Sequence, residues 1–171
     1  MKKEQDLKRL PYGVADFDKF RKKNYYYVDK TRYIRDIEKK GDYLFLIRPR
    51  RFGKSLFLGV LEAYYDMALK DRFDYFFSGT DIHRNPTKEK NRYLVFKLNF
   101  SEVSSDISMV EESFLNYTQE TAADFIRKYG KFLDIDIDKA EAEFISRKSA
   151  SDVMVTLLKY CKRQKQEIYV I

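Results

Sequence analysis

The sequence has little of the residues that build disulfide frameworks, zinc sites and thiol catalysts. It contains one cysteine, Cys161, and one histidine, His83, in 171 residues. A disulfide needs two cysteines, a structural zinc ion takes about four Cys or His ligands, and a Cys-His nucleophile needs both groups in one site. The two counts argue against all three classes. Cys161 shares a helical face with Met154, Leu157 and Leu158 and is expected in the core, whereas His83 is expected in a surface loop.

Long apolar runs are also missing. No stretch approaches the ~20 residues that a membrane-spanning helix needs, and residues 1–6 do not lead into the apolar core of a signal peptide. We therefore expect a cytoplasmic protein with no membrane partner. With 44% hydrophobic residues, including 14 Phe and 14 Tyr, the chain is long enough to form one domain with a substantial core.

Positive charge is concentrated in the first third of the chain. The net charge is +7, but residues 1–55 alone carry 17 Lys or Arg and 8 Asp or Glu, a net of +9. Such an excess in one segment suits a polyanion, whether a nucleotide or a nucleic acid. A solvated basic surface without a ligand is the alternative.

The most informative motif lies within this basic segment. Residues 42–47 form an apolar run that predicts a short buried strand, and apolar residues after Lys54 recur at helical spacing. Between them, residues 48–55 read Arg-Pro-Arg-Arg-Phe-Gly-Lys-Ser. A strand, a loop ending in Gly-Lys-Ser and a helix are the order of a Walker A phosphate-binding loop. Main-chain N–H groups and the helix dipole then favour an anion at one point.

Seven consecutive residues are predicted to bind the nucleotide. Lys54 is expected to contact the β- and γ-phosphates of ATP, and the Ser55 hydroxyl to ligate Mg²⁺. The full set is Arg50, Arg51, Phe52, Gly53, Lys54, Ser55 and Leu56. A basic strand-to-helix turn without a ligand is the alternative for this loop.

The motif departs from a full Walker A sequence at its first position. Arg48 stands where a full motif has glycine, and Pro49 cannot donate a backbone hydrogen bond. Arg50 and Arg51 could compensate with charge, because guanidinium groups bind phosphate oxygens as a bidentate fork.

The other elements are predicted from periodicity and turn residues. We expect helices at 16–23, 106–129, 138–147 and 150–163, a packed turn at 73–79, and strands at 92–100 and 167–171. A further helix, the second along the chain, has Tyr33, Ile34 and Ile37 on its apolar face and is ended by Gly41. Asp16 is expected to cap the first helix, either Asp29 or Thr31 the second, and Gly130 to end the third. Residues 149–152 have the form of a capping box. Together these helices and strands predict an α/β fold.

A P-loop ATPase needs a second acidic element, usually Asp-Glu at the end of an apolar strand beside the loop strand. Residues 168–171 have the apolar character of that strand, and its acids would follow Ile171. We therefore expect an N-terminal fragment, truncated at the presumed Walker B strand and unable by itself to hydrolyse ATP. Asn99 and Glu102, after the 92–100 strand, are the nearest substitutes for those acids.

Three motifs carry a resemblance to a known family. They are Leu-Pro-Tyr-Gly at 10–13 with Phe17, Tyr-Val-Asp-Lys-Thr at 27–31, and the octet at 48–55 with the helix after it. On these motifs the whole chain resembles the predicted AAA-ATPase-like family of bacterial proteins, in which arginine in place of the first loop glycine is normal. Members continue after the final strand with Asp-Glu and further helical segments, and many end in a restriction-endonuclease-like domain.

The resemblance implies a single P-loop NTPase-like (AAA-like) domain over residues 1–171, with a parallel sheet flanked by helices and with ATP and Mg²⁺ as cofactors. Residues 1–41 would form a basic and aromatic N-terminal extension, and residues 42–171 the P-loop core. Pro11, Tyr12 or Phe17 are candidates to line an adenine pocket. Besides the nucleotide, the expected partners are the missing C-terminal region of the same protein and a second copy of the chain.

Two other functions stay open on the sequence alone. Basic residues interleave with aromatic ones in residues 19–35, as in a surface that contacts phosphates and stacks on bases, so a nucleic-acid-binding module is one alternative. A non-catalytic P-loop scaffold that binds neither ligand is the other.

Overall fold

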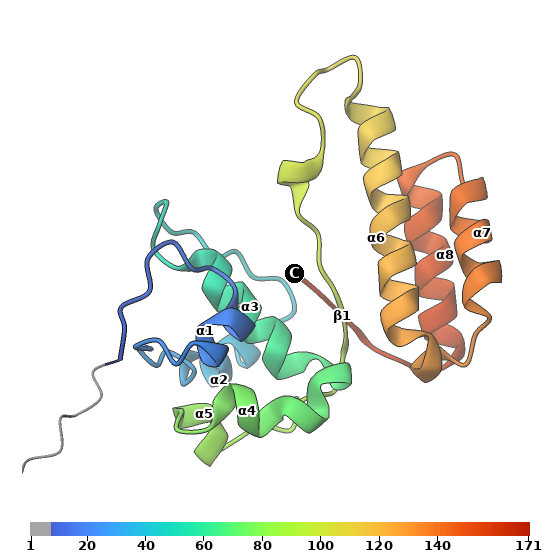
Figure 1. Ribbon diagram of the computed structural model, residues 1–171. Helices are drawn as coiled ribbons and strands as arrows, with labels where there is room; N and C mark the ends of the chain where they lie inside the picture. The colour runs from blue at the N-terminus through green and yellow to red at the C-terminus, as the bar shows by residue number, and fades with distance from the viewer. Residues whose placement is uncertain (1–7) are drawn as a thin grey trace, which may run out of the picture. The chain divides into compact units, whose positions relative to one another are not determined.

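The computed structural model describes residues 8–171 (Figure 1). Residues 1–7, part of the predicted N-terminal extension, lie outside the described residues. The chain divides into two compact units, residues 1–91 and 92–171, which are described one at a time below. The single domain with an extension ending at residue 41 stays a prediction.

The first unit consists of short helices around an aromatic core. Its elements are α1 (Phe17–Lys22), α2 (Tyr33–Glu38), α3 (Lys54–Tyr65), the 3₁₀ helix η1 (Met67–Arg72), α4 (Phe73–Phe77) and α5 (Asp81–Arg84). Phe17 of α1 stacks on Phe76 of α4 with 5.6 Å between ring centroids, and Tyr64 of α3 meets Phe77 edge-on at 5.6 Å. Such ring pairs contribute about 0.5–1.5 kcal/mol beyond the area they bury. The aromatic residues therefore hold α1, α3 and α4 together.

The starts of α1 and α2 test the predicted caps. Asp16 accepts a hydrogen bond from the backbone N–H of Lys19 at 3.0 Å, which confirms it as the cap of α1. The prediction for α2 is wrong, because its N-cap is Arg32 and no side chain caps it. The side chains of Asp29 and Thr31 instead accept hydrogen bonds at the start of α5.

Two segments predicted as turn or loop are helical. The packed turn at 73–79 contains the helix α4, whose three phenylalanines are buried. His83 lies in α5 rather than in a surface loop, because its ring stacks on Phe73 at 5.7 Å and its Nε2 lies 2.9 Å from Oδ1 of Asp74. Helices this short depend on packing rather than on intrinsic propensity, so sequence periodicity does not reveal them.

The second unit combines three helices with a two-stranded parallel sheet. Its elements are β1 (Leu94–Phe96), the 3₁₀ helix η2 (Phe100–Glu102), α6 (Val110–Leu133), α7 (Ile137–Ser146), α8 (Ala150–Arg163) and β2 (Ile168–Val170). Helix α6 lies beside both α7 and α8 (Figure 1). Leu94 pairs with Ile168 and Phe96 with Val170. Both predicted strands of this unit are confirmed, although β1 is shorter than the predicted 92–100.

Helix α6 runs past the glycine that was predicted to end it. It continues to Leu133, and Asp134, with φ of 49°, forms a left-handed C-cap. Gly130 is buried, and a Cβ built on it would lie 2.9 Å from Cγ1 of Ile137. Glycine is therefore required here for the close approach of α7 rather than for a helix end, and the prediction is wrong on this point.

The starts of α7 and α8 are set by local side chains. Asp136 caps α7 by accepting from the N–H of Lys139 at 3.1 Å. Ser149 caps α8 by accepting from the N–H of Asp152 at 3.1 Å, which confirms the first half of the predicted capping box. The Asp152 carboxylate accepts from the Ser149 hydroxyl at 2.8 Å rather than from the Ser149 N–H. Cys161 of α8 is 2% exposed, so its predicted place in the core is confirmed.

Residues 42–47 are not a strand in the structure, and the predicted buried strand before the loop is wrong. Tyr43, Phe45 and Ile47 are 91%, 93% and 91% exposed. A strand is defined by hydrogen bonds to a neighbouring strand, and in the described part of the chain the sheet consists of β1 and β2. Apolar character alone therefore gave the wrong assignment.

The helices and the parallel sheet agree with the predicted α/β class. The finer prediction, a P-loop NTPase-like sheet flanked by helices, belongs to the proposal below. Within residues 8–171, no helix is both long enough and apolar enough to cross a membrane.

Candidate functional site

Two residues of the loop before α3 have left-handed backbone angles. Gly53, the N-cap of α3, has φ of 73°, and Arg51 has φ of 67°. Glycine adopts this conformation without the Cβ clash that costs other residues about 1–2 kcal/mol. No described atom lies within 4 Å of a Cβ built on Gly53, so the backbone angle rather than lack of space requires glycine there.

The first turn of α3 is uncapped. No side chain in the described part of the chain bonds to its N–H groups, whereas α1, α7 and α8 each have a side-chain cap. The turn has no acidic residue, and both Lys54 and Ser55 are exposed. A helix N-terminus carries roughly half a positive charge together with N–H groups that lack partners within the helix. This end of α3 is therefore suited to an anion.

Basic side chains surround the same helix end. Arg50, Arg51 and Lys54 are exposed, and among residues 8–171 no carboxylate pairs with any of them. Arg72 in the same unit, by contrast, pairs with Asp18. The positive charge of the loop is thus available to a ligand.

The residues predicted to bind phosphate and Mg²⁺ lie together at this point. Residues 50–55 are all exposed around the start of α3, and Leu56 is half-buried on its flank. The Ser55 hydroxyl and the oxygens of a bound phosphate would form an oxygen donor set, which is what Mg²⁺ prefers. The residues present therefore fit a nucleotide-bound magnesium ion.

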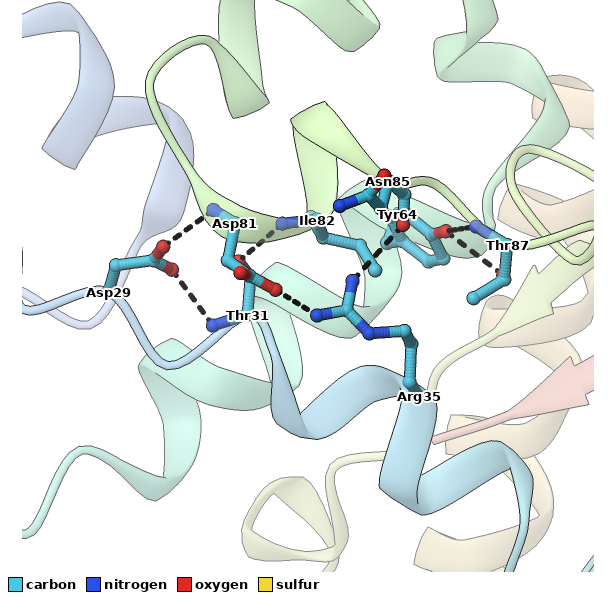
Figure 2. A network of polar contacts seen from close by, with 8 residues as sticks. All are labelled: Asp29, Thr31, Arg35, Tyr64, Asp81, Ile82, Asn85 and Thr87. Carbon is cyan, nitrogen blue, oxygen red and sulfur yellow. Dashed lines mark hydrogen bonds and ion pairs between the residues drawn. The ribbon is translucent and has the colours of Figure 1, made fainter.

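The opposite end of α3 is held by hydrogen bonds of two buried tyrosines. The Tyr64 hydroxyl accepts a hydrogen bond from the N–H of Thr87 at 2.7 Å (Figure 2), and the Tyr65 hydroxyl donates to Glu38 at 3.2 Å. Burial raises the pKa of Tyr64 above its usual range, so its hydroxyl keeps its proton. These contacts fix the helix that presents the exposed first turn.

Helix α5 is capped by side chains from a distant segment (Figure 2). Asp29 accepts a hydrogen bond from the N–H of Asp81 at 2.7 Å, and Thr31 Oγ1 accepts one from the N–H of Ile82 at 3.1 Å. The N-cap residue of α5, Thr80, makes no side-chain cap of its own. Asp29 and Thr31 thus perform the capping function in its place.

The same segment also holds the other end of α5. Arg35 donates to the carbonyl oxygen of Asn85 at 3.1 Å and forms an ion pair with Asp81. The motif at 27–31 is therefore explained by structure rather than by ligand binding. In the sequence, Asp29 and Thr31 are two short hydrogen-bond acceptors two residues apart. This pattern predicts a cap for the nearest helix and gives no sign of α5.

Of the three residues predicted to line an adenine pocket, Phe17 is not available for that role. Phe17 is 3% exposed and packs in the aromatic core against Phe76, so its ring cannot stack on a base. Tyr12 is 95% exposed, and Pro11 is half-buried. The prediction for Phe17 is corrected to a core residue.

Asn99 and Glu102, the substitutes considered for the second acidic element, bond to each other. Asn99 Nδ2 donates to Glu102 Oε1 at 2.6 Å, and Asn99 Oδ1 accepts from the Ser101 hydroxyl at 2.7 Å. Asn99 is also the N-cap of η2. A local capping role accounts for both side chains.

Similarity to known proteins covers nearly the whole chain at the level of family. The family described as "Predicted AAA-ATPase" matches residues 11–171. A curated protein of Azotobacter chroococcum mcd 1, described as "Uncharacterized protein in vnfD 5'region", is 53% identical over 55 residues, which are 32% of this chain and 11% of that protein. The match thus spans a small part of that relative's length. No solved structure matches the chain.

Proposed function

Because the chain belongs to the predicted AAA-ATPase family, we propose that it binds ATP with Mg²⁺ through a variant Walker A loop. In this proposal Lys54 contacts the β- and γ-phosphates, Ser55 ligates Mg²⁺, and the first N–H groups of α3 bond to phosphate oxygens. Arg50 and Arg51 add the charge that offsets the missing first glycine. The protein then has a P-loop NTPase-like fold and acts in the cytoplasm, where ATP is abundant.

One observation carries the proposal. The first turn of α3 is uncapped, follows the left-handed Gly53, and is flanked by exposed cations that no described carboxylate neutralises. Uncapped N–H groups and unpaired cations at one point favour an anion, and Gly-Lys-Ser at the start of a helix is the sequence with which P-loop proteins bind phosphate. Family membership makes the nucleotide the favoured phosphate ligand.

Titration of a fluorescent ATP analogue in Mg²⁺ buffer tests the proposal. Lys54→Ala is expected to weaken binding about 10- to 100-fold, because a hydrogen bond to a charged group contributes about 1.5–3 kcal/mol. The matched control is Lys88→Ala, which removes an equally exposed lysine of the same unit and should change affinity by less than about twofold, since a distant surface charge is screened. Equal affinities of wild type and Lys54→Ala would contradict the assignment of the loop.

The non-catalytic scaffold predicts a different outcome of the same titration. In that case neither wild type nor Lys54→Ala changes the fluorescence of the analogue at any concentration tested. Binding that is lost in Lys54→Ala and kept in Lys88→Ala excludes the scaffold, because a vestigial loop has no reason to depend on its lysine.

Nucleic-acid binding by the whole of residues 19–35 is less favoured, because two arginines of this segment are bonded within the protein. Arg21 donates to the carbonyl oxygens of Tyr75 and Ser78 at 3.3 and 2.9 Å, and Arg35 is engaged with α5. Two of the arginines in that segment therefore serve the fold. Lys19, Lys22 and Lys23, by contrast, are exposed to solvent.

A further inference from the structure

The outer face of α1 carries a row of exposed lysines. Lys19, Lys22 and Lys23 are exposed, and their spacing of three and four residues places them on one side of the helix. Phe17 and Phe20, on the opposite side, are buried in the aromatic core. The lysines therefore face solvent on a helix whose orientation is fixed by packing.

The two segments that adjoin α1 carry two more exposed side chains, Arg9 and Tyr26. The carbonyl oxygen of Arg9 accepts a hydrogen bond from the N–H of Tyr26 at 2.9 Å, which joins the segment before α1 to the segment after it. Tyr26 is 55% exposed, whereas Tyr25 and Tyr27 each pack on Phe20 with 5.6 Å between ring centroids. We name the set of Arg9, Lys19, Lys22, Lys23 and Tyr26 the α1 basic face.

Among residues 8–171, no carboxylate forms an ion pair with a cation of the α1 basic face. The carboxylate of Asp16 is engaged in capping α1, and Asp18 pairs with Arg72. Arg21 is not part of this face, because its guanidinium donates to the carbonyl oxygen of Ser78. Four exposed cations and one exposed aromatic ring therefore lie on α1 and on the two segments that adjoin it, and the hydrogen bond between Arg9 and Tyr26 joins those two segments.

We infer that the α1 basic face binds single-stranded nucleic acid, its cations contacting phosphates and Tyr26 stacking on a base. Cations along a surface track a phosphate backbone, and an aromatic ring beside them stacks on any unpaired base. A duplex offers phosphates but keeps its base faces inside the stack, so the exposed ring favours a single strand. This inference does not depend on the proposed nucleotide site.

Fluorescence anisotropy of a labelled oligothymidine strand with the full chain tests the inference. Four phosphate contacts on a single strand predict a slope of about −2.8 in log K against log salt, so affinity should fall about 50-fold between roughly 50 and 200 mM salt. Affinity independent of salt would overturn the inference. So would tighter binding to a duplex of the same length, because the ring would then contribute nothing.

Matched triple variants separate this face from overall charge. Lys19→Ala with Lys22→Ala and Lys23→Ala is expected to lower affinity by more than about tenfold, since about three of the phosphate contacts are removed. The control, Lys39→Ala with Lys40→Ala and Lys88→Ala, removes the same charge from exposed positions elsewhere in the unit and should leave most of the affinity. An equal loss in both triples means that binding follows net charge alone, which overturns the inference. Replacing the three α1 lysines by arginine should preserve binding.

Single variants test the ring and the independence from the loop. Tyr26→Ala should weaken strand binding about tenfold, because stacking of one base contributes about 1–3 kcal/mol, and Tyr43→Ala serves as the control at another exposed tyrosine. Lys54→Ala should bind the strand as wild type does. If Lys54→Ala loses strand binding while the α1 triple keeps it, the loop is the phosphate contact and the inference fails.

Discussion

The carboxylate of Asp29 accepts a hydrogen bond from the backbone N–H of Asp81 at 2.7 Å, although the two residues are 52 positions apart in the sequence. Its other oxygen accepts from the N–H of Thr31 at 2.9 Å. One side chain thus shapes its own segment and caps a helix formed much later in the chain.

Removal of this carboxylate should destabilise the first unit. Asp29→Ala leaves the first N–H of α5 without its cap, and loss of a cap costs about 0.5–2 kcal/mol. Urea unfolding should show a lower midpoint with an unchanged slope. Asp42→Ala, at an exposed position with no side-chain partner among the described residues, is the control and should change the free energy of unfolding by less than about 0.5 kcal/mol. If Asp29→Ala unfolds at the same urea concentration as wild type, the cap does not contribute to stability and the prediction is wrong.

Two glycines of the same region should respond in opposite ways to alanine. Gly53 has φ of 73°, so Gly53→Ala strains the loop by about 1–2 kcal/mol and should weaken ATP binding. Gly59 lies inside α3, and a Cβ there would meet Phe17 Cβ at 3.5 Å, an ordinary contact. Gly59→Ala should therefore stabilise the helix by up to about 1 kcal/mol and keep ATP affinity. Thermal unfolding and the fluorescent titration measure the two effects, and similar behaviour of both variants would contradict the role given to Gly53.

Gly130→Ala should destabilise the second unit although alanine favours helices. The new Cβ would lie 2.9 Å from Cγ1 of Ile137, and overpacking of this kind costs about 1–3 kcal/mol. The gain in helix propensity, about 1 kcal/mol, does not offset that clash. In combination with Ile137→Ala, which removes the clashing atoms, Gly130→Ala should be much less harmful. A double-mutant cycle measures this coupling, and additive effects would refute the close approach of α7.

Cys161 should resist thiol reagents until the protein unfolds. Burial raises the pKa of the Cys161 thiol from its ordinary value of 9.0 to about 11, so little thiolate exists at neutral pH in the folded chain. Between pH 9.0 and about pH 11, the Cys161 thiol is therefore protonated in the folded chain and ionised in the unfolded chain. Stability should therefore be insensitive to this group below pH 9 and fall as pH rises toward 11.

A disulfide reagent added at pH 8 checks the first part of this prediction, with reaction expected to be slow in buffer and fast in urea. Urea midpoints measured between pH 8 and 10 for wild type and Cys161→Ser check the second. Rapid reaction of the folded chain would mean that the thiol is accessible, contrary to its 2% exposure.

Local signals in the sequence predicted local structure well. Asp16 and Ser149 were identified as caps because a cap bonds to an N–H three residues further on, so the whole interaction lies in a short window. The apolar periodicity of α3 and α8 identified both helices for a similar reason. The candidate site residues, 50–56, are contiguous, and their grouping at the start of α3 follows from the sequence alone.

Features that depend on distant partners were not predictable in this way. Gly130 reads as a helix end unless one knows that Ile137 packs against it. Asp29 and Thr31 read as caps of the next helix, since nothing nearby points to α5. Residues 42–47 have the composition of a strand, but composition does not supply the neighbouring strand that would accept their hydrogen bonds.

The distance along the chain between Asp29 and α5 sets an order of events during synthesis. A ribosome adding roughly 5–20 residues per second needs about 3–10 s to make the intervening segment, so the segment around Asp29 is synthesised that long before the helix that it caps. The segment around Asp29 thus reaches its final contacts only after α5 has formed, and a nascent chain stalled before Asp81 should be cut by proteases in that segment.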